Sequence, residues 1–189
     1  MILDAVAACI AEEGIEGATI RRIAERANVS TGMLTYYYAN KREMLAAALD
    51  TAGTHLRERI DSVAGPEPGP QRFDAVFNLL FTSRDEETRP WAFWVEYWAA
   101  ATREPEVGNQ HPPFAGMQAN MTKWIEAGMR DGFFPPETDP VKGAKMLHAL
   151  MIGLGMTTCL TDLTTREAED ITQMAISLLR AGAGVEGRP

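Results

Sequence analysis

The sequence has few cysteines, and their spacing excludes disulfide-rich and zinc-binding proteins. Only Cys9 and Cys159 are present among 189 residues. They lack both a framework of neighbouring cysteines and the close ligand spacing of a metal site. We therefore expect two reduced, buried thiols, no metal and no cofactor.

The signatures of common catalytic sites are also absent. The sequence contains no H-E-x-x-H pair, no phosphate loop of the G-x-x-x-x-G-K-S/T type and no G-x-S-x-G nucleophile turn. Its three histidines, His55, His111 and His148, are isolated from one another. A lone histidine is more often structural than catalytic, so we expect no catalytic residues. An enzyme built on a helical body and a purely structural dimer are the alternatives.

Long apolar runs and targeting signals are missing as well. No uninterrupted apolar stretch reaches membrane-spanning length, and no charged, apolar and small-residue signal pattern opens the chain. Together with the reduced cysteines, these absences predict a cytoplasmic protein.

Positive charge is scarce overall but concentrated in one segment. Between Thr19 and Arg42, five basic side chains accompany one acid, Glu25, so the segment carries +4 and, against the total of -8, the remainder carries -12. This asymmetry is typical of a basic DNA-binding segment joined to an acidic body. An acidic surface is also ordinary for soluble proteins, so the charge alone decides little.

The pattern within this basic segment predicts a helix-turn-helix. A first helix buries one apolar face, formed by Ile20, Ile23, Ala24 and Ala27. Its other face carries Arg21, Arg22 and Arg26, which point toward solvent or phosphate. Asn28 follows at the corner, where the backbone must tolerate a left-handed conformation.

A second helix is expected to start after Ser30, whose side chain can accept a hydrogen bond from the Met33 amide. Its outer face is small and polar and consists of Thr31, Gly32, Thr35 and Tyr36. Leu34 and Tyr38 turn inward. Small and polar residues at the start of such a helix allow close entry into the major groove of DNA.

A third helix is expected to begin after Asn40. Asn40 and Glu43 have the spacing of a capping box. This start places Lys41 and Arg42 at a helix N-terminus, where they would lie beside the phosphate backbone.

The segment from Thr19 to Leu45 resembles the N-terminal domain of TetR-family transcriptional regulators. It reads T-I-R-R-I-A-E-R-A-N-V-S-T-G-M-L-T-Y-Y-Y-A-N-K-R-E-M-L, and the pattern V-S-T-G-x-x-x-x-Y within it is similar to their betaine-regulator-like branch. The resemblance covers roughly the first 50 residues. It implies an all-helical homodimer that binds a double-stranded DNA operator.

The resemblance also implies roles for single residues. In the family, the positions of Thr19, Tyr37 and Lys41 commonly touch phosphates, and the outer face of the second helix touches bases. Tyr36 replaces a frequent histidine there, which leaves the operator sequence open but not the domain. The predicted DNA-binding set is Thr19, Arg21, Arg22, Ser30, Thr31, Gly32, Thr35, Tyr36, Tyr37 and Lys41. No basic arm precedes Ile2, so either minor-groove contacts are absent or the sequence begins late.

The remaining chain is predicted to be helical. Periodicity and Gly or Pro breakers place helices at Ile2 to Glu13, Lys41 to Ala64, Phe73 to Phe81, Glu86 to Arg103, about Pro140 to Leu160 and about Arg166 to Ala181. A further helix follows Pro112-Pro113, contains Met117, Met121, Trp124, Ile125 and Met129, and ends at Gly132. The predicted fold is all-α, with about nine helices. A helix-turn-helix domain spans residues 1–45, and an effector-binding and dimerisation domain spans residues 46–189.

The last two helices are strongly apolar. The final one carries a stripe formed by Ile171, Met174, Ala175, Leu178 and Leu179. Burial of this stripe against a second copy of the chain resembles the dimer interface of the family. Packing within one chain only is the alternative.

Aromatic residues are concentrated in the segment from Glu86 to Arg103. Together with methionines of neighbouring helices they are predicted to wall a small-molecule site, formed by Trp91, Trp94, Glu96, Tyr97, Trp98, Met117, Met121, Trp124 and Met151. The same residues could equally be core. Glu96 beside aromatic rings favours a cationic ligand, unless it is exposed or paired with a lysine. We therefore expect a ligand-responsive DNA-binding regulator, and by resemblance a repressor that a small-molecule effector releases from a palindromic operator.

Overall fold

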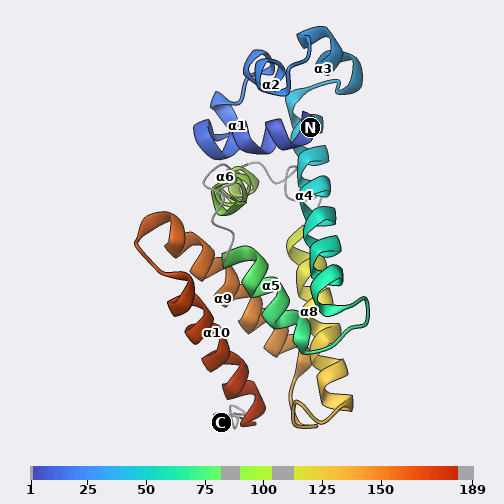
Figure 1. Cartoon of the computed structure of the whole chain (residues 1–189), viewed down its shortest axis with the longest axis vertical. Coiled ribbons are helices and arrows are strands. Elements are labelled where there is room, and N and C mark those ends of the chain that lie inside the picture. Colours follow the sequence, from blue (N-terminus) through green and yellow to red (C-terminus); the bar gives the residue numbers. More distant parts are fainter. Residues whose placement is uncertain (1, 82–89, 104–112, 183–189) are drawn as a thin grey trace. The chain divides into compact units, whose positions relative to one another are not determined.

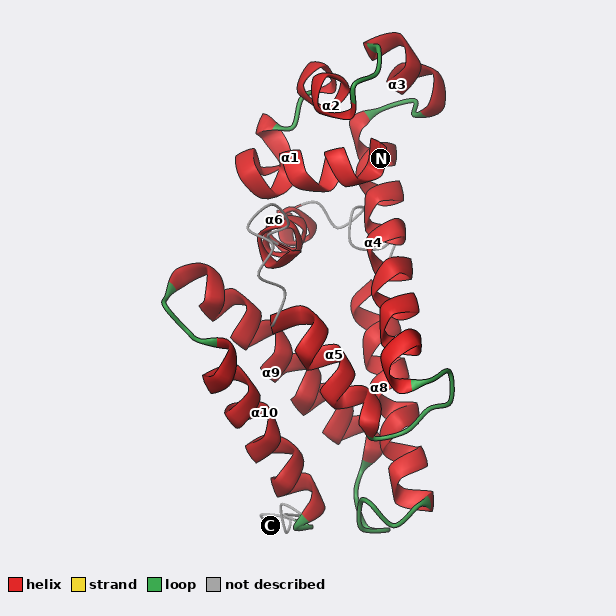
Figure 2. Ribbon diagram, viewed as in Figure 1, coloured by secondary structure: helices red, strands yellow, loops and turns green. Residues whose placement is uncertain are grey.

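The computed structural model describes residues 2–81, 90–103 and 113–182, and these residues form nine helices and no strand (Figure 2). The predicted all-α fold is confirmed. In chain order the helices are α1 (Ile2–Gly17), α2 (Ile20–Ala27), α3 (Thr31–Tyr37), α4 (Lys41–Ala64), α5 (Gln71–Phe81), α6 (Pro90–Arg103), α8 (Pro113–Arg130), α9 (Pro140–Leu160) and α10 (Thr165–Arg180). The predicted start of a helix at Glu86, and His111, lie outside the described residues.

The helices divide into two compact units. The first contains α1, α2, α3, α6 and the part of α4 that ends at His55, and the second contains α4 from Leu56 together with α5, α8, α9 and α10 (Figure 1). This grouping by packing differs from the division at residue 45 expected from the sequence. The difference arises because α6 packs along α1 and extends the first unit.

The first unit is built around one apolar core. Helices α1, α2, α3, α4 and α6 all contribute to it, through Val6, Cys9, Ile10, Ala18, Ile23, Ala24, Leu34, Met44, Leu45, Ala48, Leu49, Phe93 and Tyr97. Each helix therefore buries one apolar stripe and leaves its other face to solvent. The helix-turn-helix rests on this core.

Helix α1 does not stop at Gly14, where the sequence predicted its end. Gly14 has non-helical dihedrals (φ 72°, ψ 171°), and the helix resumes for one turn up to Gly17. The Ala18 amide donates to the Gly14 carbonyl oxygen at 3.1 Å. Glycine adopts this positive φ without steric cost, so the residue kinks α1 rather than ending it.

The second unit packs its helices around aromatic side chains. Phe73 of α5 makes edge-to-face contacts with Trp124 of α8, at 5.4 Å between ring centroids, and with Phe134, at 6.4 Å. Helix α10 packs on α5 and α9. The bounds predicted for α4 and α9 match those observed.

Helix α9 begins at an Asp139 cap and runs through the second unit. Asp139 accepts hydrogen bonds from the amides of Val141 (3.1 Å) and Lys142 (3.0 Å), and Pro140 occupies the first turn. Among the described helices α9 alone is long and apolar enough to cross a membrane, a test that core helices also pass. Its buried face, which includes Leu147 and Met151, is that of a core helix.

The two cysteines differ in exposure. Cys9 is buried, and burial raises the pKa of its thiol. Cys159 is exposed, so the prediction of two buried thiols is wrong for it. It lies at the end of α9 and is followed by Leu160, which is also exposed. Residues in an apolar stretch of sequence are therefore not always buried.

Candidate nucleic-acid interface

The corner between α2 and α3 is a sharp, hydrogen-bonded turn. Asn28 has left-handed dihedrals (φ 53°, ψ 46°), as the sequence predicted, and its amide donates to Glu25 at 3.2 Å. The Val29 amide donates to the Ala24 carbonyl at 3.0 Å. Leu34 is fully buried in the core below the turn. These contacts fix the angle at which α3 is held.

Helix α3 presents an uncharged, exposed face. Ser30 caps the helix by accepting a hydrogen bond from the Met33 amide at 3.1 Å, as predicted. The predicted base-reading residues are all exposed, namely Thr31, Gly32, Thr35 and Tyr36. The Thr35 hydroxyl lies 3.2 Å from the carbonyl oxygens of both Thr31 and Gly32, to which it can donate.

Two tyrosines project from the end of α3. Tyr36 is 82% exposed and Tyr37 is 63% exposed, and their rings meet edge to face at 5.2 Å. Large aromatic side chains are usually covered in a folded protein. Their exposure on one short helix marks a contact surface.

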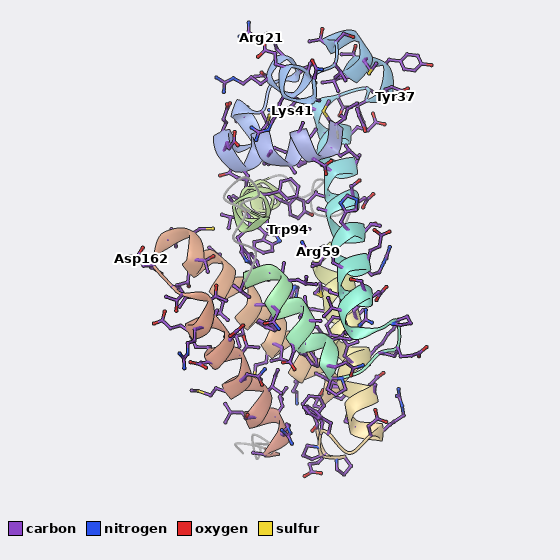
Figure 3. The ribbon with its side chains drawn as sticks, viewed as in Figure 1. Arg21, Tyr37, Lys41, Arg59, Trp94 and Asp162 are labelled. Carbon is purple, nitrogen blue, oxygen red and sulfur yellow. The ribbon has the colours of Figure 1, made fainter. Side chains whose placement is uncertain are left out.

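Groups that can bind phosphate lie beside this face. Arg21, Tyr37 and Lys41 come from α2, α3 and the start of α4 (Figure 3). The Lys41 ammonium donates to the Glu16 carbonyl at 3.3 Å. Thr19 caps α2, with its hydroxyl oxygen accepting from the Arg22 amide at 3.4 Å.

The arginines of α2 are not equivalent. Arg21 lies on the exposed face and pairs with Glu25 of its own helix at 3.6 Å. Arg22 pairs with Glu13 of α1. Arg26 pairs with Glu12 of α1, at 2.6 Å. The basic character expected from the sequence is thus partly balanced by α1.

The start of α4 is capped from two sides. The Asn40 side chain accepts from the Glu43 amide at 2.9 Å. The Glu43 carboxylate accepts from the Ala39 amide at 2.7 Å, one residue before the amide that the capping-box spacing predicted. The cap holds Lys41 and Arg42 in the first turn of α4.

The residues predicted to bind an effector are distributed over both units. Trp91, Trp94, Glu96, Tyr97 and Trp98 lie on α6 in the first unit, whereas Met117, Met121, Trp124 and Met151 lie in the second. Met121, Trp124 and Met151 are buried in the second unit's core. A surface pocket of about 420 Å³ in the second unit involves none of them and is lined by Gly132, Phe133, Pro135, Ser177, Arg180 and Ala181.

Three tryptophan rings lie next to one another on helix α6. Trp94 stacks on Trp98 with ring centroids 6.2 Å apart, and Trp91 lies 6.2 Å from Trp98. Tyr97 is part of the first unit's core, and burial raises the pKa of its phenol. A Glu96 carboxylate oxygen lies 3.1 Å from the point that a Cβ on Gly14 would occupy. The acid therefore sits against the kink in α1.

The ion pairs that two acids of α1 form with α2 were not predicted from the sequence. Glu12 and Glu13 lie outside the basic segment, and nothing in their spacing indicates which arginine each one meets. The only available signal was the helix pattern, which places two acids just before a predicted helix end at Gly14. No cluster of metal-ligating side chains occurs among the residues that the structure describes.

Two family models match the chain. The model for bacterial regulatory proteins of the TetR family matches residues 2–48, and the model for the C-terminal domain of BetI-type transcriptional repressors matches residues 70–181. The curated BetI regulator of Serratia proteamaculans is 25% identical over 179 residues, which are 90% of this chain and 85% of that protein. The BetI regulator of Burkholderia lata is 26% identical over 190 residues, with coverages of 95% and 92%.

Solved structures of similar fold span almost the whole chain. A TetR-family transcriptional regulator from Rhodococcus sp. matches with a TM-score of 0.84 and 25% identity, covering 95% of this chain and 96% of that one. A transcriptional regulator from Saccharomonospora viridis, solved in complex with choline, matches with a TM-score of 0.77 and 20% identity, covering 94% and 92%.

Proposed function

The chain belongs to the TetR family of bacterial regulatory proteins and has a BetI-type C-terminal domain, and from this premise we propose that it is a repressor. It binds a palindromic operator as a homodimer and leaves the operator when a small-molecule effector binds. The observation that carries the proposal is the exposed, uncharged face of α3, held at a fixed angle by the Asn28 corner. Residues 1–45 bind DNA, and residues 46–189 bind the effector and the second subunit.

The docking surface consists of α3 and its flanks. Thr31, Gly32, Thr35 and Tyr36 face the base edges of the major groove, because small side chains at the start of α3 let the backbone approach closely. Thr19, Arg21, Tyr37 and Lys41 contact phosphates and set the register. The Ser30 hydroxyl acts indirectly, since it caps α3.

The exposed stripe of α10 supports a homodimer. Met174 is 65% exposed, and Ile171 and Leu178 on the same stripe are exposed as well. On α9, Met156 and Leu160 are also exposed. Contiguous apolar surface of this kind marks an interaction site. A twofold contact of α9 and α10 with their counterparts would bury it on both subunits at once.

The effector is proposed to be a small cation of the quaternary ammonium class. One similar regulator was solved with choline bound. In this chain, α6 carries three indole rings and Glu96, and aromatic faces attract such cations, by about 0.5–2 kcal/mol per contact. A carboxylate adds charge complementarity. The class of ligand, rather than one compound, follows from this chemistry.

The effector acts by shifting a population of conformations. In one conformation of the dimer the spacing of the two α3 helices fits the operator, and in the other it does not. An effector that binds the second conformation more tightly lowers the population of the first, and the ratio of its affinities for the two conformations limits the size of this shift. Family membership favours this regulator over the two alternatives, an enzyme or a purely structural dimer. A DNA target implies a cytoplasmic location.

Two substitutions test the placement of the docking surface. Tyr36→Ala should change the preferred base at one position of each half-site, whereas Lys41→Ala should weaken binding to all sequences about equally and lower the salt slope by about one. Lys145→Ala, an exposed lysine of α9, is the matched control. Operator binding that ignores both changes would contradict the placement.

A further inference from the structure

Two acids of α1 form ion pairs with two of the three arginines of α2. Glu12 and Glu13 end the regular part of α1, directly before the Gly14 kink. Glu13 pairs with Arg22. Glu12 accepts a hydrogen bond from Arg26 at 2.6 Å. Both pairs join α1 to α2 within the first unit.

Arg26 also lies near the Cys9 thiol of α1. The Cys9 thiol is buried beneath this corner, and burial raises its pKa while the nearby Arg26 charge works against that shift. Arg26 and Arg22 pair with acids of α1, and their side chains are 38% and 50% exposed. Arg21, by contrast, lies on the exposed face, with its side chain 80% exposed.

Acids outnumber bases in residues 2–55, the part of the first unit that contains the helix-turn-helix. From Ile2 to His55 the sequence has five basic side chains and seven carboxylates. Most proteins that bind DNA through long-range attraction carry a clear excess of positive charge on the binding domain. Here six acids outside the segment from Thr19 to Arg42 cancel its excess, and two of them, Glu12 and Glu13, pair with its arginines.

We propose that Glu12 and Glu13 are specificity-determining residues, which hold Arg26 and Arg22 in neutral pairs and so limit binding to DNA of arbitrary sequence. This inference rests on the proposed DNA-binding function. Non-specific affinity comes almost entirely from phosphate neutralisation and counterion release. The pairs of Arg22 and Arg26 differ from the 3.6 Å pair of Arg21 and Glu25, whose side chains are 80% and 67% exposed, because they join two helices. They offer no net charge to the polyanion, and if either arginine turned to a phosphate its glutamate would remain nearby and repel the backbone. Discrimination then depends on the uncharged face of α3.

Titration of a random-sequence duplex over a range of salt concentrations tests this inference. The variant Glu12→Gln/Glu13→Gln keeps a hydrogen-bond acceptor for each arginine but releases two positive charges. Each released arginine should steepen the slope of log affinity against log salt by about 0.9, and two of them by about 1.8 per DNA-binding unit. Between 50 and 200 mM salt, the affinity of the variant should fall on the order of tenfold further per unit than that of the wild type.

Two further variants make the test independent of stability. The fourfold variant Glu12→Gln/Glu13→Gln/Arg22→Gln/Arg26→Gln removes both pairs and leaves no acid without its partner. It should therefore keep the wild-type slope. Glu58→Gln/Glu126→Gln removes two exposed acids of the second unit and is the control for net charge. It should leave the slope unchanged.

The outcomes separate this inference from the proposed function. A steeper slope for the Glu12 and Glu13 variant alone supports it. Equal slopes for that variant and the wild type overturn it, and so does a shallower slope for the fourfold variant, because the arginines would then already contact phosphate. If the wild type shows no salt-dependent binding to any duplex, the proposed function itself fails.

Discussion

Within the second unit, Arg72 joins α5 to the end of α4 and to α8, and its removal should have a large effect on stability. The side chain is almost completely buried. Its guanidinium donates to the Asp61 carboxylate of α4 and to the Gly65 carbonyl just after α4. It also lies over the Trp124 ring of α8, 5.3 Å from the ring centroid. One residue of α5 thus joins three segments.

The size of the effect follows from these contacts. A hydrogen bond to a charged group contributes about 1.5–3 kcal/mol, and the ring contact contributes about 0.5–2 kcal/mol. The Asp61 side chain is 40% exposed, so water screens its attraction to Arg72. Water can also hydrate the Asp61 carboxylate when Arg72 is removed. We therefore expect Arg72→Met to lower the free energy of unfolding by about 3 kcal/mol, which corresponds to about 6–12 °C in Tm for a chain of this size.

Urea and thermal unfolding followed by circular dichroism would measure this loss. Arg59→Met, which removes an exposed arginine of α4, is the matched control and should change stability by less than about 0.5 kcal/mol. A cycle with Asp61→Asn should give a coupling energy of about 1 kcal/mol or more between the two residues. If the Arg72→Met protein is as stable as the Arg59→Met control, the contacts of Arg72 do not stabilise the fold as we expect.

Two further predictions concern the second unit. Burial lowers the pKa of His148 to about 4, so between pH 6.5 and 4 the unfolded chain binds a proton that the folded protein does not, and stability should fall on acidification by at most about 3 kcal/mol. His148→Gln should flatten this part of the stability profile relative to His55→Gln, and identical profiles for the two variants would contradict the assignment. Met174→Glu places a charge on the exposed stripe of α10 and should convert a dimer into a monomer in analytical ultracentrifugation, whereas Glu126→Gln should not. A dimer that persists unchanged with Met174→Glu would exclude that stripe from the interface.

Local patterns predicted the helices well. The bounds of α4 and α9 agree with those predicted because each helix has a clear signal at one end, Gly65 after the end of α4 and Asp139-Pro140 at the start of α9. The left-handed Asn28 and the Ser30 cap were also predicted, since one or two neighbouring residues decide such features. Local chemistry was sufficient at each of these positions.

Contacts between distant segments were not predictable in the same way. Helical periodicity shows that one face of α6 is apolar, but not that this face joins α1 through Phe93 and Tyr97. Likewise, nothing in the sequence pairs Arg22 with Glu13. The same limit explains the exposed Cys159, because hydrophobicity indicates a preference for burial and not the element that supplies the cover.

Selection of binding sites from a pool of random duplexes would show directly whether two α3 helices dock in successive major grooves. We expect the wild-type protein to enrich an inverted repeat whose half-sites are centred about 34–36 Å apart, or a multiple of one helical turn. We also expect Tyr36→Ala to select a different base in each half-site. Enriched sequences without twofold symmetry, or identical sequences for both proteins, would contradict the docking of α3 in successive major grooves.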